Sequence, residues 1–132
     1  MTDLIYDVGM DDGDDSEFYL LKGFRVVAVE ADPDLCRAAG ERFQPFLQSG
    51  LLTIVNRAIV PKAGPATFYR SSNPGWGTVA EDWHRYNVAH GVAADSLVVA
   101  GQSLGGTARS RSTRCWTAGS TSPTTNRPTS PC

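Results

Sequence analysis

The stretch LIYDVGMDDGDDSEFYLLKGFRVVAVEADP, residues 4–33, decides the fold that the sequence predicts. Its first apolar run, Leu4–Tyr6, predicts a buried strand that ends in a turn at Gly9. Acidic residues typical of helix starts then precede a short helix over 17–22. The β-branched run 24–29 predicts a second strand that is buried on both faces.

The same alternation continues toward residue 100. Asp32 and Pro33 have the residue types of an N-cap and a first helical position, and Pro45 interrupts the last turns of the helix that they begin. Residues 51–55 predict a third apolar strand. Strands are also predicted at 66–69 and 96–100, a helix at 79–88, and a continuation of the third strand or a turn at 58–60. Strand and helix alternation at this spacing indicates an α/β fold, a doubly wound Rossmann-like parallel sheet with ligands at the carboxyl ends of its strands.

Charge is unevenly distributed along the 132 residues. Eleven of the fourteen acidic residues fall within residues 1–50, whereas residues 102–132 contain no acid and four arginines. Those last residues also show no apolar period, so we expect them to be disordered. The predicted organisation is a folded part at 1–100 and a low-complexity tail at 101–132.

Composition argues against several classes of protein. The formal net charge of −2 is unlike that of a nucleic-acid binder, and no apolar run reaches the ~18 residues of a membrane span. No signal peptide is recognisable, and three cysteines are too few for a disulfide scaffold. We therefore expect a cytoplasmic protein with reduced thiols and neither a nucleic-acid nor a membrane partner.

The loop after the first strand carries the predicted chemistry. Gly9 and Gly13 let the backbone approach a ligand, and Asp7 and Glu30 each end an apolar strand, where an acid is costly unless something pairs with it. Glu30 lies 23 residues after Asp7, the position of a carboxylate that accepts ribose hydroxyls. The five acids between residues 7 and 15 would repel a dinucleotide pyrophosphate, whereas the sulfonium and ammonium of S-adenosylmethionine suit them.

Other candidate residues leave alternatives open. Asn56, at the end of the third strand, either reaches an adenine or caps a turn. His84 and His90 are the two histidines that could act as a base, but each is more typical of a solvated side chain, so the catalytic residue is not assigned. The pattern predicts no metal site, and Cys36 is expected to be a buried helix residue rather than a nucleophile.

The stretch IYDVGMDDGDDSEFYLLKGFRVVAVEADPDLCRAAGERF, followed by LTIVNRAIV and GPATFYRSSNPGWGTV, resembles the FkbM family of S-adenosylmethionine-dependent methyltransferases over roughly residues 4–80. The resemblance implies a doubly wound sheet and methyl transfer to a hydroxyl of a sugar or natural-product acceptor. It also implies that Ser71–Trp76 faces that acceptor. The residues that it implies for the cofactor are Asp7, Gly9, Asp11 and Gly13 at the methionine end, Glu30 with the adjoining Ala31 at the ribose, and Asn56 with Ala58 near the adenine.

The sequence departs from the family after about residue 100. A further strand with an acidic motif is expected there, and an acid-free stretch rich in Arg, Ser, Thr, Pro and Gly stands in its place. We interpret the chain as a truncated or frameshifted methyltransferase with an incomplete sheet, which would bind cofactor without useful turnover. The alternatives are an NAD-dependent oxidoreductase half-domain and a non-catalytic remnant. The sequence does not indicate an oligomeric state.

Overall fold

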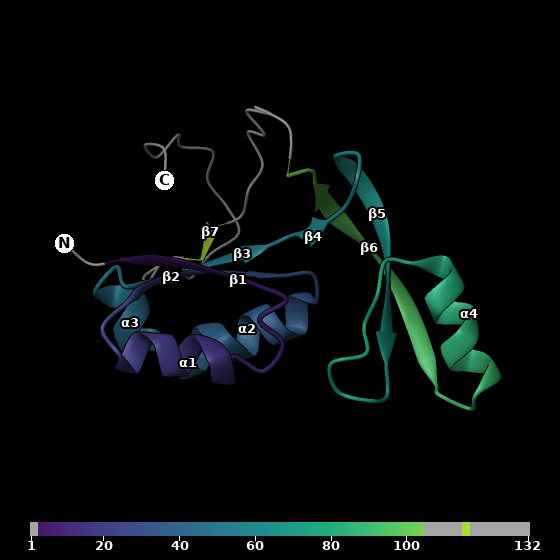
Figure 1. The fold of residues 1–132 in the computed structure, drawn as a ribbon, viewed down its shortest axis with the longest axis horizontal. Helices are drawn as coiled ribbons and strands as arrows, with labels where there is room; N and C mark the ends of the chain where they lie inside the picture. Colours follow the sequence, from purple (N-terminus) through teal and green to yellow (C-terminus); the bar gives the residue numbers. More distant parts are fainter. Residues whose placement is uncertain (1–2, 105–114, 117–132) are drawn as a thin grey trace.

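The protein is a mixed α/β molecule with two small sheets, shown by a computed structural model that describes residues 3–104 and 115–116 (Figure 1). The first sheet has the strand order β1-β2-β3-β7, and its strands are β1 (Leu4–Val8), β2 (Arg25–Glu30), β3 (Leu52–Asn56) and β7 (Cys115–Trp116). Strands β1, β2 and β3 are parallel, and β7 pairs antiparallel with β3. The register places Tyr6 beside Val27 and Val27 beside Thr53.

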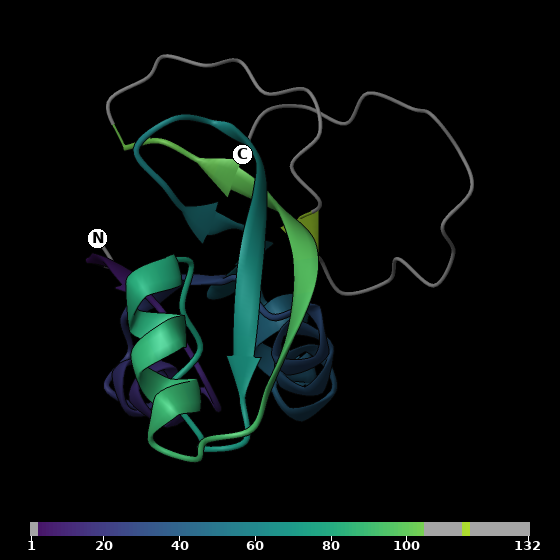
Figure 2. The same ribbon diagram turned by 90° about the vertical axis from the view of Figure 1, so that its right-hand side faces the viewer.

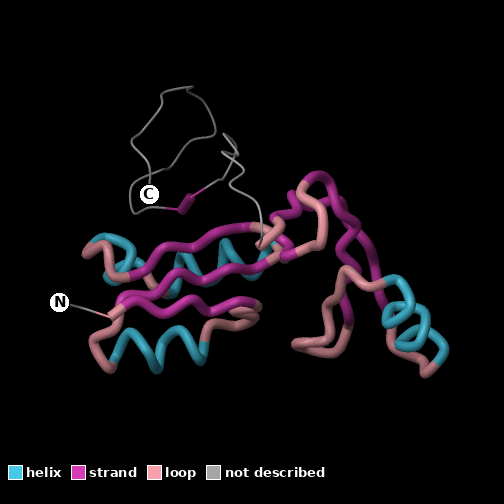
Figure 3. The backbone as a smooth tube through the Cα atoms, turned by 45° about the horizontal axis from the view of Figure 1, so that its top comes forward, coloured by secondary structure: helices cyan, strands magenta, loops and turns pink. Residues whose placement is uncertain are grey.

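Three helices cover one face of the first sheet (Figures 1 and 3). They are α1 (Asp14–Leu21), α2 (Pro33–Arg42) and α3 (Gln44–Gln48). The predicted start of α2 is confirmed, because the Asp32 carboxylate accepts a hydrogen bond from the backbone N–H of Asp34 and Pro33 is the first helical residue. Pro45 lies in the first turn of α3, where its missing N–H costs nothing, and the predicted interruption is a break into two helices.

The hydrophobic core lies between this sheet face and the helices. Val26, Ala28 and Ile54 are fully buried on the strands, and Cys36 and Phe43 meet them from α2 and the residue that follows it. Burying each of the larger side chains contributes roughly 1.5–3 kcal/mol. The core therefore holds one sheet face and the three helices together as a unit.

The prediction that the first strand is buried is wrong for one of its faces. Leu4, Tyr6 and Val8 are exposed, and on the second strand Val27 and Val29 are half-buried rather than buried. The cause is that the three helices packed on the first sheet all lie on its other face (Figure 1). An apolar strand is fully buried only where both faces are covered.

The second sheet has the order β4-β6-β5 and carries one helix. Its elements are β4 (Ala58–Ile59), β5 (Gly64–Ser71), α4 (Glu81–Ala89) and β6 (Ala94–Gln102). Helix α4 runs beside the long β5–β6 pair (Figure 2), and the rings of Tyr69 and His84 stack with centroids 4.0 Å apart. The strands predicted at 66–69 and 96–100 are thus confirmed, but they are longer and pair with each other away from the first sheet.

The predicted boundary at residue 100 falls inside β6, which continues to Gln102. Most of the tail that was expected to be disordered lies outside the described residues. Within the part of the chain that the structure describes, no helix is long and apolar enough to cross a membrane.

Candidate functional site

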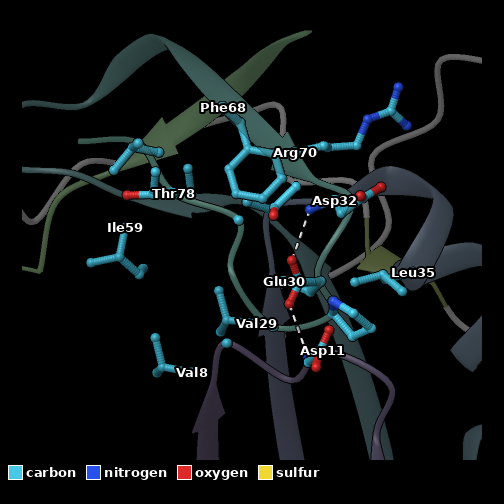
Figure 4. A pocket seen from close by; sticks show the side chains of 18 of the residues that line it. Val8, Asp11, Val29, Glu30, Asp32, Leu35, Ile59, Phe68, Arg70 and Thr78 are labelled. Atoms are coloured by element: carbon cyan, nitrogen blue, oxygen red, sulfur yellow. Dashed lines mark hydrogen bonds between the residues drawn. The ribbon is translucent and has the colours of Figure 1, made fainter. Parts of the chain in front are cut away.

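A cavity of about 610 Å³ lies at the carboxyl ends of β1 and β2, between the first sheet and the loop that follows β5 (Figure 4). Five of the eight predicted cofactor residues line it, namely Gly9, Asp11, Glu30, Ala31 and Ala58. The other three, Asp7, Gly13 and Asn56, do not line it. The cavity is where an α/β sheet of this kind binds its ligands.

The loop after β1 presents backbone to the cavity at Gly9. Its φ of 84° lies in the left-handed region that favours glycine, and a Cβ at this position would meet open space. The N–H groups of Gly9 and Met10 both donate to the carbonyl of Val29, at 2.8 and 3.2 Å, which attaches the loop to the end of β2. A ligand can therefore approach the Gly9 backbone closely without displacing a side chain.

Gly13 packs closely against a core side chain. It has a φ of 91°, and a Cβ there would lie 2.6 Å from the Cε2 of Phe43. Phe43 is only 1% exposed, so the ring has no room to move away. Gly13 thus allows the start of α1 to lie on the Phe43 ring, beneath the loop that lines the cavity.

Glu30 joins the two loops that border the cavity. Its side chain is 7% exposed, and its two oxygens each accept a backbone hydrogen bond of 2.9 Å, Oε2 from Asp11 N and Oε1 from Asp32 N (Figure 4). This arrangement positions the loop after β1 against the start of α2. Because a carboxylate oxygen can accept two hydrogen bonds, both oxygens retain capacity for ligand hydroxyls.

Asp11 has an unusual backbone conformation and a partly buried carboxyl group. Its φ of 52° is in the left-handed region, which is unusual for a residue other than glycine. Partial burial raises the pKa of its carboxyl above the usual value, and the neighbouring charge of Asp12 adds to the rise. Its Oδ2 lies 3.4 Å from where a Cβ of Gly75 would be, so the carboxylate lies next to the loop after β5. A cationic ligand in the cavity would offset the repulsion from Asp12 and favour the ionised form of Asp11.

Asp7 and Asn56 support the walls of the cavity. The Ser16 hydroxyl donates to Asp7 Oδ2 at 2.6 Å, which pairs this strand-end acid with α1. The Asn56 side-chain amide donates to the carbonyls of Glu30 and Ala31, at 2.9 and 3.0 Å. These contacts are those of a side chain that closes a turn, and the contact of Asn56 with an adenine stays a prediction.

Sequence reasoning missed Arg70, which lies at the cavity rim on β5. Its guanidinium forms a bidentate pair with Asp95 of β6, at 3.0 and 2.6 Å, and donates to Asp34 of α2 at 2.8 Å. We call these contacts the Arg70 latch. The hydrogen bonds from Arg70 hold the pKa of the Asp95 carboxyl below its usual value. No sequence signal could join these residues, because they lie 25 and 36 positions apart.

The Arg70 latch is expected to hold the loop after β5 over the cavity. Arg70→Gln should release the 71–77 loop from the first sheet, which we expect to appear as faster proteolysis within that loop. Arg85→Gln is the matched control, since among the described residues Arg85 pairs with Glu81 and Asp82 of its own helix. Equal cleavage of the two variants would contradict the role given to the latch.

The remaining candidates lie away from the cavity. His84 stacks on Tyr69, and His90 Nδ1 lies 2.8 Å from the carbonyl of Tyr86, but neither histidine lines the cavity. Cys36 is buried as predicted; burial and the nearby Glu30 charge raise the pKa of its thiol to about 12, which disfavours a nucleophilic thiolate. Between residues 3 and 104, no group of His, Cys, Asp and Glu side chains is placed to hold a metal ion.

The cavity combines acidic groups with apolar walls. Asp11, Asp12, Glu30 and Asp32 supply four carboxylates, and Arg57 and Arg70 supply two cations. The apolar lining comes from Val8, Val29, Leu35, Ile59 and Phe68. Ser71, Ser72 and Asn73, from the end of β5 and the loop after it, also line the cavity. Comparisons with family models, with curated proteins and with solved structures find no match for this chain. The function is therefore argued from the residues of the cavity.

Proposed function

We propose that the cavity binds S-adenosylmethionine and that the protein has the cofactor-binding half of a Rossmann-like methyltransferase. The proposed reaction is methyl transfer to a hydroxyl of a sugar or natural-product acceptor. The resemblance of residues 4–80 to the FkbM family supports the cofactor and the acceptor class. The three parallel strands with their helices on one face are compatible with half of a doubly wound sheet.

The acidity of the cavity is the observation that carries the proposal. The backbone N–H of Asp11 donates a hydrogen bond to the Glu30 carboxylate. Asp12 and Asp32 line the same cavity. At ~5 Å and an effective dielectric constant of ~20, each carboxylate would repel a pyrophosphate charge by about 3 kcal/mol. The same carboxylates would attract a sulfonium and an ammonium. Four carboxylates against two arginines leave the lining net acidic, and Arg70 is already paired with Asp34 and Asp95, so the cavity favours S-adenosylmethionine over a dinucleotide.

The proposed orientation follows the order of groups around the cavity. The methionine end would lie against the Gly9 backbone and Asp11, and the ribose hydroxyls would donate to Glu30. The adenine would lie between Ala31 and Ala58. Asp7, Gly13 and Asn56, which do not line the cavity, would act by holding these walls in place.

The chain's own contribution to the reaction would be positioning. S-adenosylmethionine supplies an activated methyl group, and in-line transfer requires the acceptor oxygen at near-attack distance, a requirement worth about 7–11 kcal/mol of the barrier. The Ser71, Ser72 and Asn73 side chains line the side of the cavity from which an acceptor would come. The Arg70 latch would keep that loop close to the cofactor.

Calorimetric titration with S-adenosylhomocysteine and with NAD tests the cofactor. We expect S-adenosylhomocysteine to bind at least tenfold more tightly than NAD, because it carries no phosphate that the carboxylates of the cavity would repel. The double variant Asp11→Asn, Asp12→Asn should bind NAD more tightly than wild type does, which would reduce the difference between the two dissociation constants. Tighter binding of NAD would favour the oxidoreductase alternative, and binding of neither would favour the non-catalytic remnant.

Radiolabelled methyl transfer to a panel of sugars and small alcohols tests the reaction. Incorporation of label that depends on intact Ser71–Asn73 would support the acceptor site. Cofactor binding with little or no transfer is the result that an incomplete sheet predicts, whereas efficient transfer would contradict the truncation.

A further inference from the structure

Strand β1 has an open edge. In the described residues it pairs with β2 on one side and with no strand on the other. Its exposed side chains are large and apolar, with Leu4 at 38%, Tyr6 at 67% and Val8 at 55% exposure. The strand contains neither lysine nor proline, the residues that commonly protect an edge from pairing.

The backbone hydrogen bonds show which residues face the open edge. The Asp3 carbonyl accepts from Arg25 N at 2.9 Å, and Gly9 N donates to the Val29 carbonyl at 2.8 Å. Backbone groups of successive strand residues point to alternate sides, so the odd-numbered residues bond to β2. Leu4, Tyr6 and Val8 therefore direct their N–H and C=O groups to the open edge.

We propose that this edge pairs with the same edge of a second copy of the chain, antiparallel and across a two-fold axis at Tyr6. In that register Tyr6 lies opposite Tyr6 of the second copy, and Leu4 lies opposite its Val8. Each opposing pair exchanges both backbone hydrogen bonds, so every outward N–H and C=O of β1 is satisfied. The two sheets become one continuous sheet, with a central aromatic cross-strand pair.

The charges favour this register. It places Asp7 opposite Ile5 of the second copy, whereas parallel in-register pairing would place Asp7 beside Asp7. Like charges directly opposite one another destabilise a strand pair. A two-fold arrangement also requires a surface that is complementary to itself, and the sequence Leu-Ile-Tyr-Asp-Val meets that requirement about its centre.

The rest of this sequence offers no obvious strand for the edge. Outside the described residues, positions 105–114 and 117–132 contain as apolar residues only Ala108, Ala118 and Cys132. An alternating apolar pattern is what a partner strand would need. A second copy of β1 has an apolar residue at every second position, at Leu4, Tyr6 and Val8. We therefore propose a second copy, and not residues 105–114 or 117–132, as the partner of the edge.

Sedimentation velocity over a range of protein concentration tests the proposal. We expect wild type to shift from one chain's mass to that of two, and Tyr6→Lys to raise the dimer dissociation constant at least tenfold. Val98→Lys is the matched control, since Val98 is an exposed strand residue of the second sheet, at 73% exposure. A monomer at all concentrations, open-ended assemblies, or equal effects of the two variants would each overturn the proposal.

Amide hydrogen exchange of the unmodified chain provides a test that needs no variant. The amides of Leu4, Tyr6 and Val8 should become protected as concentration rises. Those of Ile5 and Asp7, which face β2, should be protected throughout. Outward amides that exchange fast at every concentration would overturn the proposed pairing even if a dimer forms.

Discussion

Gly13→Ala is expected to lower the free energy of unfolding by about 2–5 kcal/mol, a large share of the roughly 5–15 kcal/mol of a whole domain. Two costs combine. Alanine disfavours the φ of 91°, and its Cβ would lie 2.6 Å from a ring carbon of the buried Phe43. Chemical denaturation followed by circular dichroism measures the change.

Gly23→Ala separates the two costs. Gly23 has a φ of 88°, but a Cβ there would meet no atom within 4 Å. We expect this control to lose only about 1–2 kcal/mol, the cost of the left-handed conformation. If both variants lose the same amount, the contact with Phe43 is not what requires glycine at position 13.

Glu30→Ala is expected to weaken binding of S-adenosylhomocysteine by about 1.5–3 kcal/mol, the range for hydrogen bonds to a charged group. The loss has two sources under the proposed function: the ribose loses its acceptor, and the Asp11 and Asp32 amides lose theirs. The second source also lowers stability, because a buried N–H without a partner is costly. Calorimetry measures the affinity and thermal unfolding measures the stability.

Two further variants serve as controls for the affinity of Glu30→Ala. Glu41→Ala removes an exposed acid from α2 outside the cavity and should leave the affinity unchanged. Glu30→Gln keeps one acceptor oxygen and should bind more tightly than Glu30→Ala. A folded Glu30→Ala protein with wild-type affinity would remove Glu30 from the ribose site and leave it a structural role only.

Local sequence was sufficient to predict the three parallel strands of the first sheet and the start of α2. Asp32 and Pro33 define the start of α2 through a side-chain cap and a preset φ, which depend on neighbouring residues alone. The strand-ending positions of Gly9 and Glu30 were predictable for the same reason, because apolar runs stop there. Their presence at one cavity follows from parallel pairing of β1 and β2, which the strand and helix alternation predicts.

Contacts between distant segments could not be predicted in this way. The alternation predicts that the strands at 64–71 and 94–102 belong to one sheet with the first three, but they pair with each other, and their antiparallel register is continuous from Gly64 to Ser71. The Arg70 latch joins three elements through charges that have no shared motif. Its place at the cavity rim therefore emerged only from the structure.

By itself the sequence located the first three strands to within one or two residues, the start of α2, and the acids at the strand ends. Those features depend on apolar periods, caps and glycines within a few residues of one another. The helix expected over 17–22 begins three residues earlier, at Asp14. Only the tertiary structure decided which faces are covered, since Leu4, Tyr6 and Val8 look like core residues until the helices are seen to lie on the other side. Whether a side chain is buried depends on which segments pack against its face of the sheet. Those segments are distant in the sequence, or belong to a second copy, so local patterns do not reveal them.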